Sequence, residues 1–302
     1  MRRIAVGLAS LMVLGGAAGP LPAAEGDLEI GGIVLKPGPQ DLVQVSQYEW
    51  AWSGGAEKFP CISFPMKSGR FAYEIRHDRK AGNGTIGLAV PTTCNWYQAG
   101  MLDLQLNGKR FDLTPDARET VEIASGRRGK VALSWENDTA KVSYTFVLLA
   151  GDDKLFLEVK LEPKVELREI AVRLMNYPSG FNHSPKHWLW TPTRKLQATG
   201  WAELNPQQEN AIFFSDETLD PANNPAAAGP SAFVFAAQEV TGGKVYVGGY
   251  GTPMTLAYKP TARRLLFCFW EFAGRPNVEA LERFQSAAPK ALQTVGDPAM
   301  SF

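Results

Sequence analysis

Apolar and polar residues alternate with a period of two along most of this chain. The clearest runs are 142–148 and 155–161, which are separated by the turn residues 151–153. A period of two places successive side chains on opposite faces of a strand, so each run predicts a strand with one buried face. With the similar runs at 131–136 and 170–174, the pattern predicts a four-stranded antiparallel meander over residues 129–176.

The two sides of this meander differ in charge. One side carries only apolar and aromatic residues, and we expect it to pack against a second sheet that includes 231–237 and 263–272, whose apolar runs indicate burial on both faces. The other side should be wet or line a groove, and any binding site should lie over it or at its rim. The residues predicted on that polar side are Lys141, Ser143, Thr145, Glu158 and Lys160.

Shorter runs predict strands on both sides of the meander. They lie at 28–35, 43–50, 70–76, 85–90, 101–106, 119–124, 187–191, 194–200, 210–215, 231–237, 244–249 and 263–272. Asn107-Gly108 predicts a hairpin between 104–106 and 111–113. One helix is expected near the C-terminus, with Asn277 as its N-cap. The chain is therefore predicted to be all-β, an antiparallel β-sandwich with one short C-terminal helix.

The first 24 residues have the layout of a secretory signal peptide, with a basic start, an apolar stretch and small residues before Glu25. We therefore expect export to the periplasm or the extracellular space, with a single sandwich domain over 25–302. A retained N-terminal anchor is the alternative. Without the leader the net charge is −2, which is too balanced for a nucleic-acid-binding protein. No later segment is long and apolar enough to span a membrane.

The three cysteines leave two interpretations open. Cys61 and Cys94 could close a disulfide loop of roughly 33 residues, or all three could be free and buried, as Cys268 is expected to be within its apolar run. No cysteine or histidine spacing suggests zinc, and no phosphate-binding, dinucleotide-binding or hydrolase motif is present. We therefore predict neither a metal site nor a cofactor.

The densest polar and aromatic cluster lies at 176–194 and holds two of the three histidines. Its two tryptophans are two residues apart, so in a strand both rings point to one face. Flat rings beside hydrogen-bonding and cationic groups suit sugars, whose ring faces are apolar and whose rims carry hydroxyls. The alternative places the tryptophans in the core. The predicted ligand-binding residues are Tyr177, Asn182, Lys186, Trp188, Trp190 and Arg194.

Catalytic groups, if the chain is an enzyme, are expected in the same region. His183 and His187 could transfer protons near neutral pH. Glu271 ends a strongly apolar strand, so it is either paired with a cation such as Arg275 or held at the rim of a pocket. His77 lies within a run of charges and is interpreted as part of a solvated turn.

The strand pattern of residues 130–177, with Trp135 at its start, resembles that of galactose-mutarotase-like supersandwich domains. The resemblance implies a supersandwich form of the β-sandwich and raises the expectation of carbohydrate chemistry. Such domains serve aldose epimerases, glycoside hydrolases and polysaccharide lyases, as well as proteins without catalysis. The epimerases use a histidine acid and a carboxylate base, for which His187 and Glu271 would be this chain's candidates.

Together these observations predict an exported protein that binds or acts on a glycan or sugar through the segment 176–194. A polysaccharide lyase or glycosidase is one alternative. A structural or envelope-interaction domain without small-molecule chemistry is the other.

Overall fold

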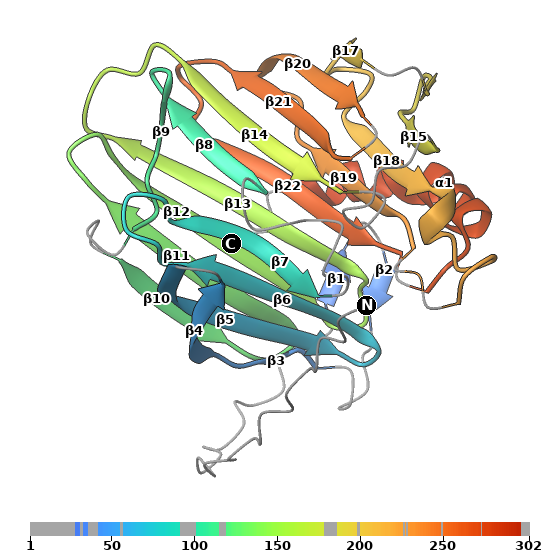
Figure 1. Ribbon diagram of the computed structural model, residues 1–302, viewed down its shortest axis with the longest axis horizontal. Helices are drawn as coiled ribbons and strands as arrows, with labels where there is room; N and C mark the ends of the chain where they lie inside the picture. The colour runs from blue at the N-terminus through green and yellow to red at the C-terminus, as the bar shows by residue number, and fades with distance from the viewer. Residues whose placement is uncertain are drawn as a thin grey trace, which may run out of the picture.

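A computed structural model describes most of the chain (Figure 1). The described residues are 28–30, 33–35, 42–54, 57–90, 101–114, 119–177, 186–197, 200–225, 227, 229–248, 250–272 and 274–296. The predicted leader at 1–24, Cys94, Asn182 and His183 lie outside these ranges, so the predictions for them remain untested.

Antiparallel strands form three main sheets and one small hairpin of β1 (Leu28–Ile30) and β2 (Ile33–Leu35). The nine-stranded sheet has the spatial order β10 (Thr120–Ala124), β11 (Arg128–Glu136), β12 (Ala140–Leu149), β13 (Lys154–Pro163), β22 (Arg264–Glu271), β19 (Ser231–Phe235), β18 (Ala211–Asp216), β15 (His187–Trp190) and β16 (Lys195–Leu196). The six-stranded sheet has the order β17 (Gly200–Leu204), β20 (Val240–Val247), β21 (Thr252–Tyr258), β14 (Ile170–Asn176), β8 (Leu102–Leu106) and β9 (Lys109–Arg110). The five-stranded sheet consists of β3 (Gln44–Val45), β5 (Glu57–Ser68), β6 (Phe71–Asp78) and β7 (Thr85–Val90), with β4 (Tyr48–Gly54) also paired to β5.

A common apolar core joins these three sheets. It includes Phe64 from the five-stranded sheet, Val172 from the six-stranded sheet and Phe146 from the nine-stranded sheet, all without solvent exposure. The five- and six-stranded sheets together therefore form the layer that faces the nine-stranded sheet (Figure 1). The predicted all-β sandwich with one helix is confirmed.

The helix α1 (Asn277–Gly296) begins at the predicted Asn277 and is 20 residues long. Its residues Ala280 and Phe284 pack against Phe213 and Trp270 on the outer face of the nine-stranded sheet. Within the part of the chain that the structure describes, no helix is long and apolar enough to cross a membrane.

The predicted division of the meander into an apolar and a polar side is confirmed. Val142 and Tyr144 on β12 and Val159 on β13 are buried in the common core. The residues between them face outward and, together with neighbours on β10 and β11, line a groove of about 680 Å³. The predicted polar residues in its lining are Lys141, Ser143, Thr145, Glu158 and Lys160.

The strand order differs from the prediction in two ways. The fourth predicted strand of the meander, β14, crosses to the six-stranded sheet, and β10 takes its place beside β11. The segments 231–237 and 263–272 do not belong to the opposite sheet, because β22 pairs with β13 and β19 pairs with β22. These strands are buried on both faces, as their apolar runs indicate, because α1 covers the outer face of the nine-stranded sheet.

Two strands that the pattern did not predict contain prolines, which cannot donate a ladder hydrogen bond. In β5, Pro60 and Pro65 instead accept from neighbouring backbone amides through their carbonyl oxygens. In β21, Pro253 lies second in the strand. The predicted Asn107-Gly108 turn is present, with φ of 53° and 74° as a tight hairpin requires, although the returning strand β9 has only two residues.

Cys61 and Cys268 are both buried and free. The Cys61 thiol donates to Asp78 Oδ1 at 3.1 Å, and burial raises its pKa to about 11, with the Asp78 carboxylate adding to the shift. Cys61 is therefore a free thiol in the structure, and it stays protonated and unreactive at neutral pH.

Candidate functional site

The predicted binding segment does not form one site, because its side chains point in different directions along β15. His187 faces inward and is buried, whereas Trp188 and Trp190 face outward. The His187 Nε2 atom lies 3.1 Å from Asp216 Oδ2, and Nδ1 contacts the carbonyl oxygen of Gly248. Both ring nitrogens thus meet oxygen acceptors, and the imidazole links the nine-stranded sheet to the end of β20 in the other layer.

A cation covers both outward tryptophans. Lys195 Nζ lies 3.8 Å from the ring centroid of Trp188 and 4.8 Å from that of Trp190. Trp190 also packs against the apolar cluster beneath α1. A sugar could stack on these rings only by displacing Lys195.

The other polar side chains of the segment have partners within the protein. Lys186 pairs with Glu217 at 2.5 Å. The Arg194 Nε atom lies 2.7 Å from Glu209 Oε1, and the buried Glu209 carboxylate also accepts from the hydroxyl of Thr191 and the backbone N–H of Asn205. Burial raises the pKa of Glu209, but these hydrogen bonds, led by that from Arg194, outweigh it and hold the pKa below its ordinary value.

Tyr177, the remaining described member of the predicted site, lies elsewhere. It follows β14 of the six-stranded sheet and packs edge-on against Tyr250, with ring centroids 5.4 Å apart. It therefore belongs to the outer face of the six-stranded sheet rather than to the surface around Trp188.

An apolar line of side chains crosses this outer face. Trp201 on β17 is the cross-strand neighbour of Tyr246 on β20, with ring centroids 5.4 Å apart, and Met175 on β14 is the neighbour of Pro253 on β21. Tyr246 lies one residue beyond the pair Val245–Met254, so the four side chains continue across four adjacent strands. We call Trp201, Tyr246, Pro253 and Met175 the aromatic row. Trp201 is 54% exposed, which leaves much of the indole open to a ligand.

A line of polar side chains runs beside the aromatic row, two residues along each strand. Cross-strand neighbours Glu203–Lys244, Lys244–Thr255, Thr255–Arg173 and Arg173–Asp103 connect it. We call these five residues the polar row. Asp103 pairs with Arg110 at 3.1 Å, whereas Glu203, Lys244 and Arg173 form no ion pair with any described residue. Lys244 Nζ lies 4.9 Å from the Trp201 ring centroid, so a cation stands directly beside the exposed indole.

Two glycines leave room for tyrosine rings at the end of this face. A Cβ atom on Gly248 would lie 2.5 Å from Tyr246 Cε1, and one on Gly251 would lie 3.2 Å from Tyr177 Cε1. Both rings therefore rest directly on the backbone of the turn between β20 and β21. The aromatic row consequently continues toward Tyr177 and Tyr250, the latter 42% exposed.

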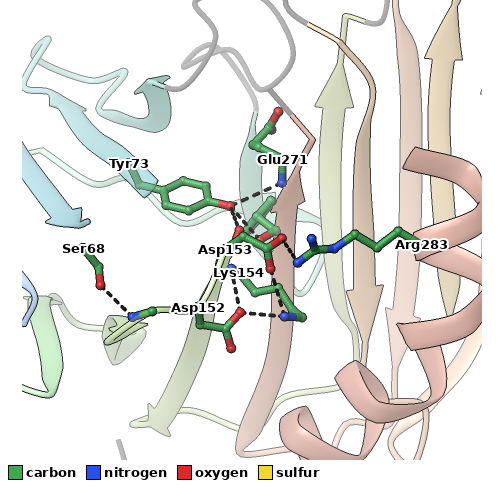
Figure 2. Close-up of polar contacts among 9 residues, drawn as sticks. Ser68, Tyr73, Asp152, Asp153, Lys154, Glu271 and Arg283 are labelled. Atoms are coloured by element: carbon green, nitrogen blue, oxygen red, sulfur yellow. Dashed lines mark hydrogen bonds and ion pairs between the residues drawn. The ribbon is translucent and has the colours of Figure 1, made fainter. Parts of the chain in front are cut away.

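Glu271 lies in a different place, at the end of β22, in the lining of a cavity of about 330 Å³ that also includes Arg275. Figure 2 shows Tyr73 beside it: the phenol donates to the backbone oxygen of Asp153 at 2.5 Å and accepts from the Glu271 N–H at 3.3 Å. The prediction that Glu271 lies at a pocket agrees with this position. Tyr73 thus ties three parts of the chain together at the cavity wall.

A cluster of charges lies next to this wall (Figure 2). Lys154 Nζ lies 2.6 Å from Asp152 Oδ1 and 3.1 Å from Asp153 Oδ1, and Arg283 of α1 pairs with Asp153. Burial lowers the pKa of Lys154, but the two carboxylates outweigh it and raise that pKa. The Lys154 ammonium therefore stays charged at neutral pH, and the pair Arg283–Asp153 anchors α1 to the turn between β12 and β13.

His187 and Glu271 are not positioned as an acid–base pair. They lie on β15 and β22, which are separated by β18 and β19. Three interstrand spacings of about 4.8 Å place them on the order of 14 Å apart. Direct proton transfer to one reacting centre needs hydrogen-bond contact, so these two groups would not share a single reaction.

His77 contradicts the solvated turn predicted for it. It is the penultimate residue of β6 and has no solvent exposure, with Nδ1 3.0 Å from Glu119 Oε1 and Nε2 2.8 Å from the Leu113 oxygen. Burial raises the pKa of Glu119, but the hydrogen bond from His77 and the nearby charges outweigh it, so that pKa is lowered. Among the described residues, no group of histidine, cysteine and acidic side chains could hold a metal ion.

Sequence signals for the aromatic row were present but incomplete. Trp201 can be recognised as an outward-facing residue only when β17 is recognised as a strand. The predicted strand at 194–200 ended one residue before Trp201. Tyr246 and Pro253 become neighbours only through the pairing of β20 with β21. Single-strand periodicity contains no information on that pairing.

Comparison with known proteins gives no family assignment. No family model and no curated protein matches this chain. Among solved structures it is similar to the α-N-acetylgalactosaminidase NagBb from Bifidobacterium bifidum, with 9% identity and a TM-score of 0.47 over 80% of this chain and 39% of that one. It is also similar to an α-mannosidase from Enterococcus faecalis, with 8% identity and a TM-score of 0.43 over 84% and 38% of the two chains.

A GH36 α-galactosidase, AgaA, from Geobacillus stearothermophilus gives 9% identity and a TM-score of 0.36 over 75% and 41% of the two chains. This chain spans about two-fifths of the length of these glycosidases. Each TM-score is below 0.5, so the likeness decides nothing about activity, and the function of the chain has to be inferred from its own side chains.

Proposed function

We propose that this protein binds a glycan across the outer face of its six-stranded sheet and that its biochemical role is carbohydrate recognition. The observation that carries the proposal is the aromatic row beside the polar row on one open sheet face. Exposed contiguous apolar surface with a polar border is the usual mark of an interaction site on a soluble protein.

The chemistry of the two rows matches that of a sugar chain. The C–H faces of pyranose rings are apolar and stack on Trp201 and Tyr246, whose flat rings lose little conformational freedom on binding. Sugar hydroxyls donate to carboxylates and accept from ammonium and guanidinium groups, which Glu203, Lys244 and Arg173 supply. Four adjacent strands span on the order of 14 Å, which suits an oligosaccharide better than a single ring.

The charge of the face favours a neutral glycan. Lys244 and Arg173 balance Glu203 and Asp103 within the polar row. Arg110, which pairs with Asp103, brings the cations to one more than the carboxylates, a smaller excess than a strongly anionic polymer would need.

The proposal is tested by measuring binding to a panel of soluble neutral polysaccharides, by affinity electrophoresis and then by isothermal titration. We expect Trp201→Ala to weaken binding of the polysaccharide with the highest affinity at least about tenfold, equivalent to 1.4 kcal/mol. Tyr48→Ala is the matched control, because Tyr48 is 47% exposed but lies on β4 of the five-stranded sheet. Unchanged binding by Trp201→Ala would contradict the proposal, and loss of binding by Trp188→Ala would return the site to the segment 176–194.

Catalysis is the less favoured role, because the predicted histidine and carboxylate are separated by two intervening strands. We further propose that residues 1–24 direct export of the protein. Expression of the whole chain in a Gram-negative host, followed by fractionation and N-terminal sequencing, tests this. A periplasmic product that begins near Glu25 is expected, and a cytoplasmic product that retains Met1 would contradict it.

A further inference from the structure

The groove on the outer face of the nine-stranded sheet lies in the layer opposite the aromatic row. Its volume of about 680 Å³ is within the range of ligand sites. Residues from β10 to β22 line it, and these five adjacent strands span on the order of 19 Å. A groove of this length suits an extended chain better than a compact small molecule.

Short hydroxyl side chains form the floor of the groove. Cross-strand pairing places Thr120 beside Ser134 and Ser134 beside Ser143, and the next residue of this row is Lys160 on β13. The Thr120 and Ser134 hydroxyls lie 2.5 Å apart and share one hydrogen bond, which leaves each with further bonding capacity. A hydroxyl both donates and accepts, so this floor can bond to the N–H and C=O groups that alternate along a peptide backbone.

One hydroxyl of the floor lacks a partner within the protein. Thr145 is 8% exposed and lines the groove, yet its hydroxyl has no hydrogen-bond partner among the described residues. Its cross-strand neighbours are Ala132, which has no polar side-chain atom, and Glu158, which pairs with Arg264. A largely buried hydroxyl without a partner costs free energy, and a ligand that supplies the hydrogen bond removes this cost.

The groove has more cations than carboxylates. Each carboxylate of its described lining pairs with a cation: Glu122 with Lys130 at 3.1 Å, Glu162 with Lys141 at 3.7 Å, and Glu158 with Arg264. Two further cations of the lining, Lys160 and Arg263, form no ion pair with any described residue.

These two unpaired cations lie at the same end of the groove. Lys160 is the cross-strand neighbour of Arg264 on β22, and Arg263 directly precedes that residue. Arg263 Nη1 donates to the backbone oxygens of Pro260 and Ala262, both at 2.8 Å, so only part of the guanidinium is occupied. The β13–β22 end can therefore bind anionic groups without the loss of an existing ion pair.

The residue types favour a peptide over other anionic chains. A polymer with an anion on every unit would bring more negative charge along the groove than two unpaired cations balance. No described residue of the lining is aromatic, so sugar rings and bases find no stacking surface there. An extended peptide rises about 3.3 Å per residue, so about six residues fill the groove, and its acidic residues can lie at one end.

We propose that this groove binds an extended, acidic segment of a partner protein. Two acidic side chains at one end of the segment lie on Lys160 and Arg263, and its uncharged residues cross the hydroxyl floor toward β10. The inference does not depend on glycan binding, because the aromatic row belongs to the other layer of the sandwich.

Isothermal titration of the whole protein with blocked synthetic hexapeptides tests the inference. The probes carry four alternating serine and glycine residues and two glutamates at either the N-terminal or the C-terminal end. The better of these two should bind at least about tenfold more tightly than the same peptide with glutamines in place of the glutamates. It should also bind more tightly than a peptide with one glutamate at each end, because the unpaired cations lie together.

Two variants separate the groove from general attraction of charge. Lys160→Gln/Arg263→Gln should lose at least about tenfold in affinity for the acidic peptide. Lys109→Gln/Arg168→Gln is the matched control, because it removes the same charge from exposed side chains outside the groove. Thr145→Val keeps the shape of the side chain and should weaken binding roughly threefold to tenfold. Its melting temperature should not fall, since the hydroxyl has no partner in the free protein.

Equal affinity for the glutamate and glutamine peptides would overturn the inference. Binding that survives Lys160→Gln/Arg263→Gln would also overturn it, as would an equal loss in the control double variant. Tighter binding of oligogalacturonate than of the acidic peptide would overturn the assignment of a peptide and give the groove to an anionic glycan. Circular dichroism confirms that each variant is folded, and the wild-type titrations alone decide the case if one is not.

Discussion

The segment 186–197 and the aromatic row both have a lysine over an indole ring, but the other charged groups of the segment form ion pairs, whereas Glu203 and Arg173 beside the row form none with a described residue. In the segment, Arg194 binds Glu209, and Lys195 lies over Trp188 and Trp190. On the other surface, Trp201 is 54% exposed beside a polar row in which three charged residues form no ion pair with any described residue. The two surfaces have similar residue types, but fewer of the charged groups beside the aromatic row form ion pairs within the protein.

The difference shows that local density of polar and aromatic residues indicates a site only when those groups are free. A ligand that binds at Arg194 must first break its bonds to a buried carboxylate, which costs about as much as the ligand returns. A ligand that stacks on Trp201 must move Lys244, whose Nζ lies 4.9 Å from the ring centroid, but it breaks no ion pair of Lys244 with a described residue. We therefore expect substitutions in the segment to change stability and substitutions on the aromatic row to change binding.

The largest effect is expected from Glu209→Gln. The carboxylate accepts from Thr191, Arg194 and Asn205, and the amide would replace a charged acceptor with a neutral group that also carries donors. Hydrogen bonds to charged groups contribute about 1.5–3 kcal/mol, so the free energy of unfolding should fall by about 2 kcal/mol. Urea denaturation followed by tryptophan fluorescence measures this.

Glu203→Gln is the matched control for that measurement, because Glu203 is an exposed glutamate on the adjacent β17, and its stability should stay within about 0.5 kcal/mol of wild type. Glycan affinity of the folded Glu209→Gln variant should be unchanged. If Glu209→Gln had the stability of wild type but bound glycans more weakly, the segment 186–197 and not the aromatic row would be the binding surface.

Lowering the pH should reduce the free energy of unfolding through Glu209 as well, by less than the Glu209→Gln substitution does. The pKa of Glu209 is lower in the folded protein than its ordinary value of 4.5, because the hydrogen bonds from Arg194 and its neighbours outweigh burial. A lowered folded pKa gives stability that is complete above 4.5 and is lost as the pH falls through the folded value. Urea midpoints measured down through this range should fall less steeply in Glu209→Gln than in wild type. Parallel curves for the two proteins would show that Glu209 contributes nothing to acid sensitivity.

Gly248→Ala should weaken glycan binding without removing a ring from the aromatic row. The new methyl group would lie 2.5 Å from Tyr246 Cε1 and 2.9 Å from the Gly251 carbonyl oxygen, so both the ring and the backbone of the turn must shift. We expect an affinity loss of roughly threefold to tenfold, about 1 kcal/mol, by isothermal titration. Gly242→Ala is the control, since a Cβ there meets nothing within 4 Å. Equal affinities of the two variants would show that the orientation of Tyr246 does not matter.

The periodicity of the sequence was sufficient to predict strands and their faces. In β12 and β13 the apolar residues face the core and the polar residues between them face outward, as the alternation predicts. The alternation within one strand is enough for this prediction, because the strand lies between the core and solvent. It was not sufficient to assign strands to sheets. The pattern of β14 is the same whether it pairs with β13 or with β21, and only long-range packing decides between them.

Predictions for some individual residues were wrong or incomplete for a similar reason, because long-range contacts decide where these residues lie. His77 lies in a run of charged residues, yet it is buried because Glu119, from outside that run, meets its ring. For Glu271 the sequence left an ion pair with a cation such as Arg275 and a place at a pocket as alternatives, and the residue does line a cavity. Trp201 was missed because its importance depends on Tyr246 of the neighbouring strand, which no local pattern links to it.

The smallest expected effect concerns the cation over the two predicted tryptophans. Lys195→Ala would uncover the rings of Trp188 and Trp190 and should lower the free energy of unfolding by about 0.5–1 kcal/mol, the usual contribution of an exposed cation–π contact. Thermal melting detects that change, with Lys109→Ala on the exposed strand β9 as the control. Glycan affinity should be the same in both variants, because the aromatic row is untouched. If the uncovered tryptophans were the true platform, Lys195→Ala would instead bind glycans more tightly than wild type, and the comparison between the two surfaces would be reversed.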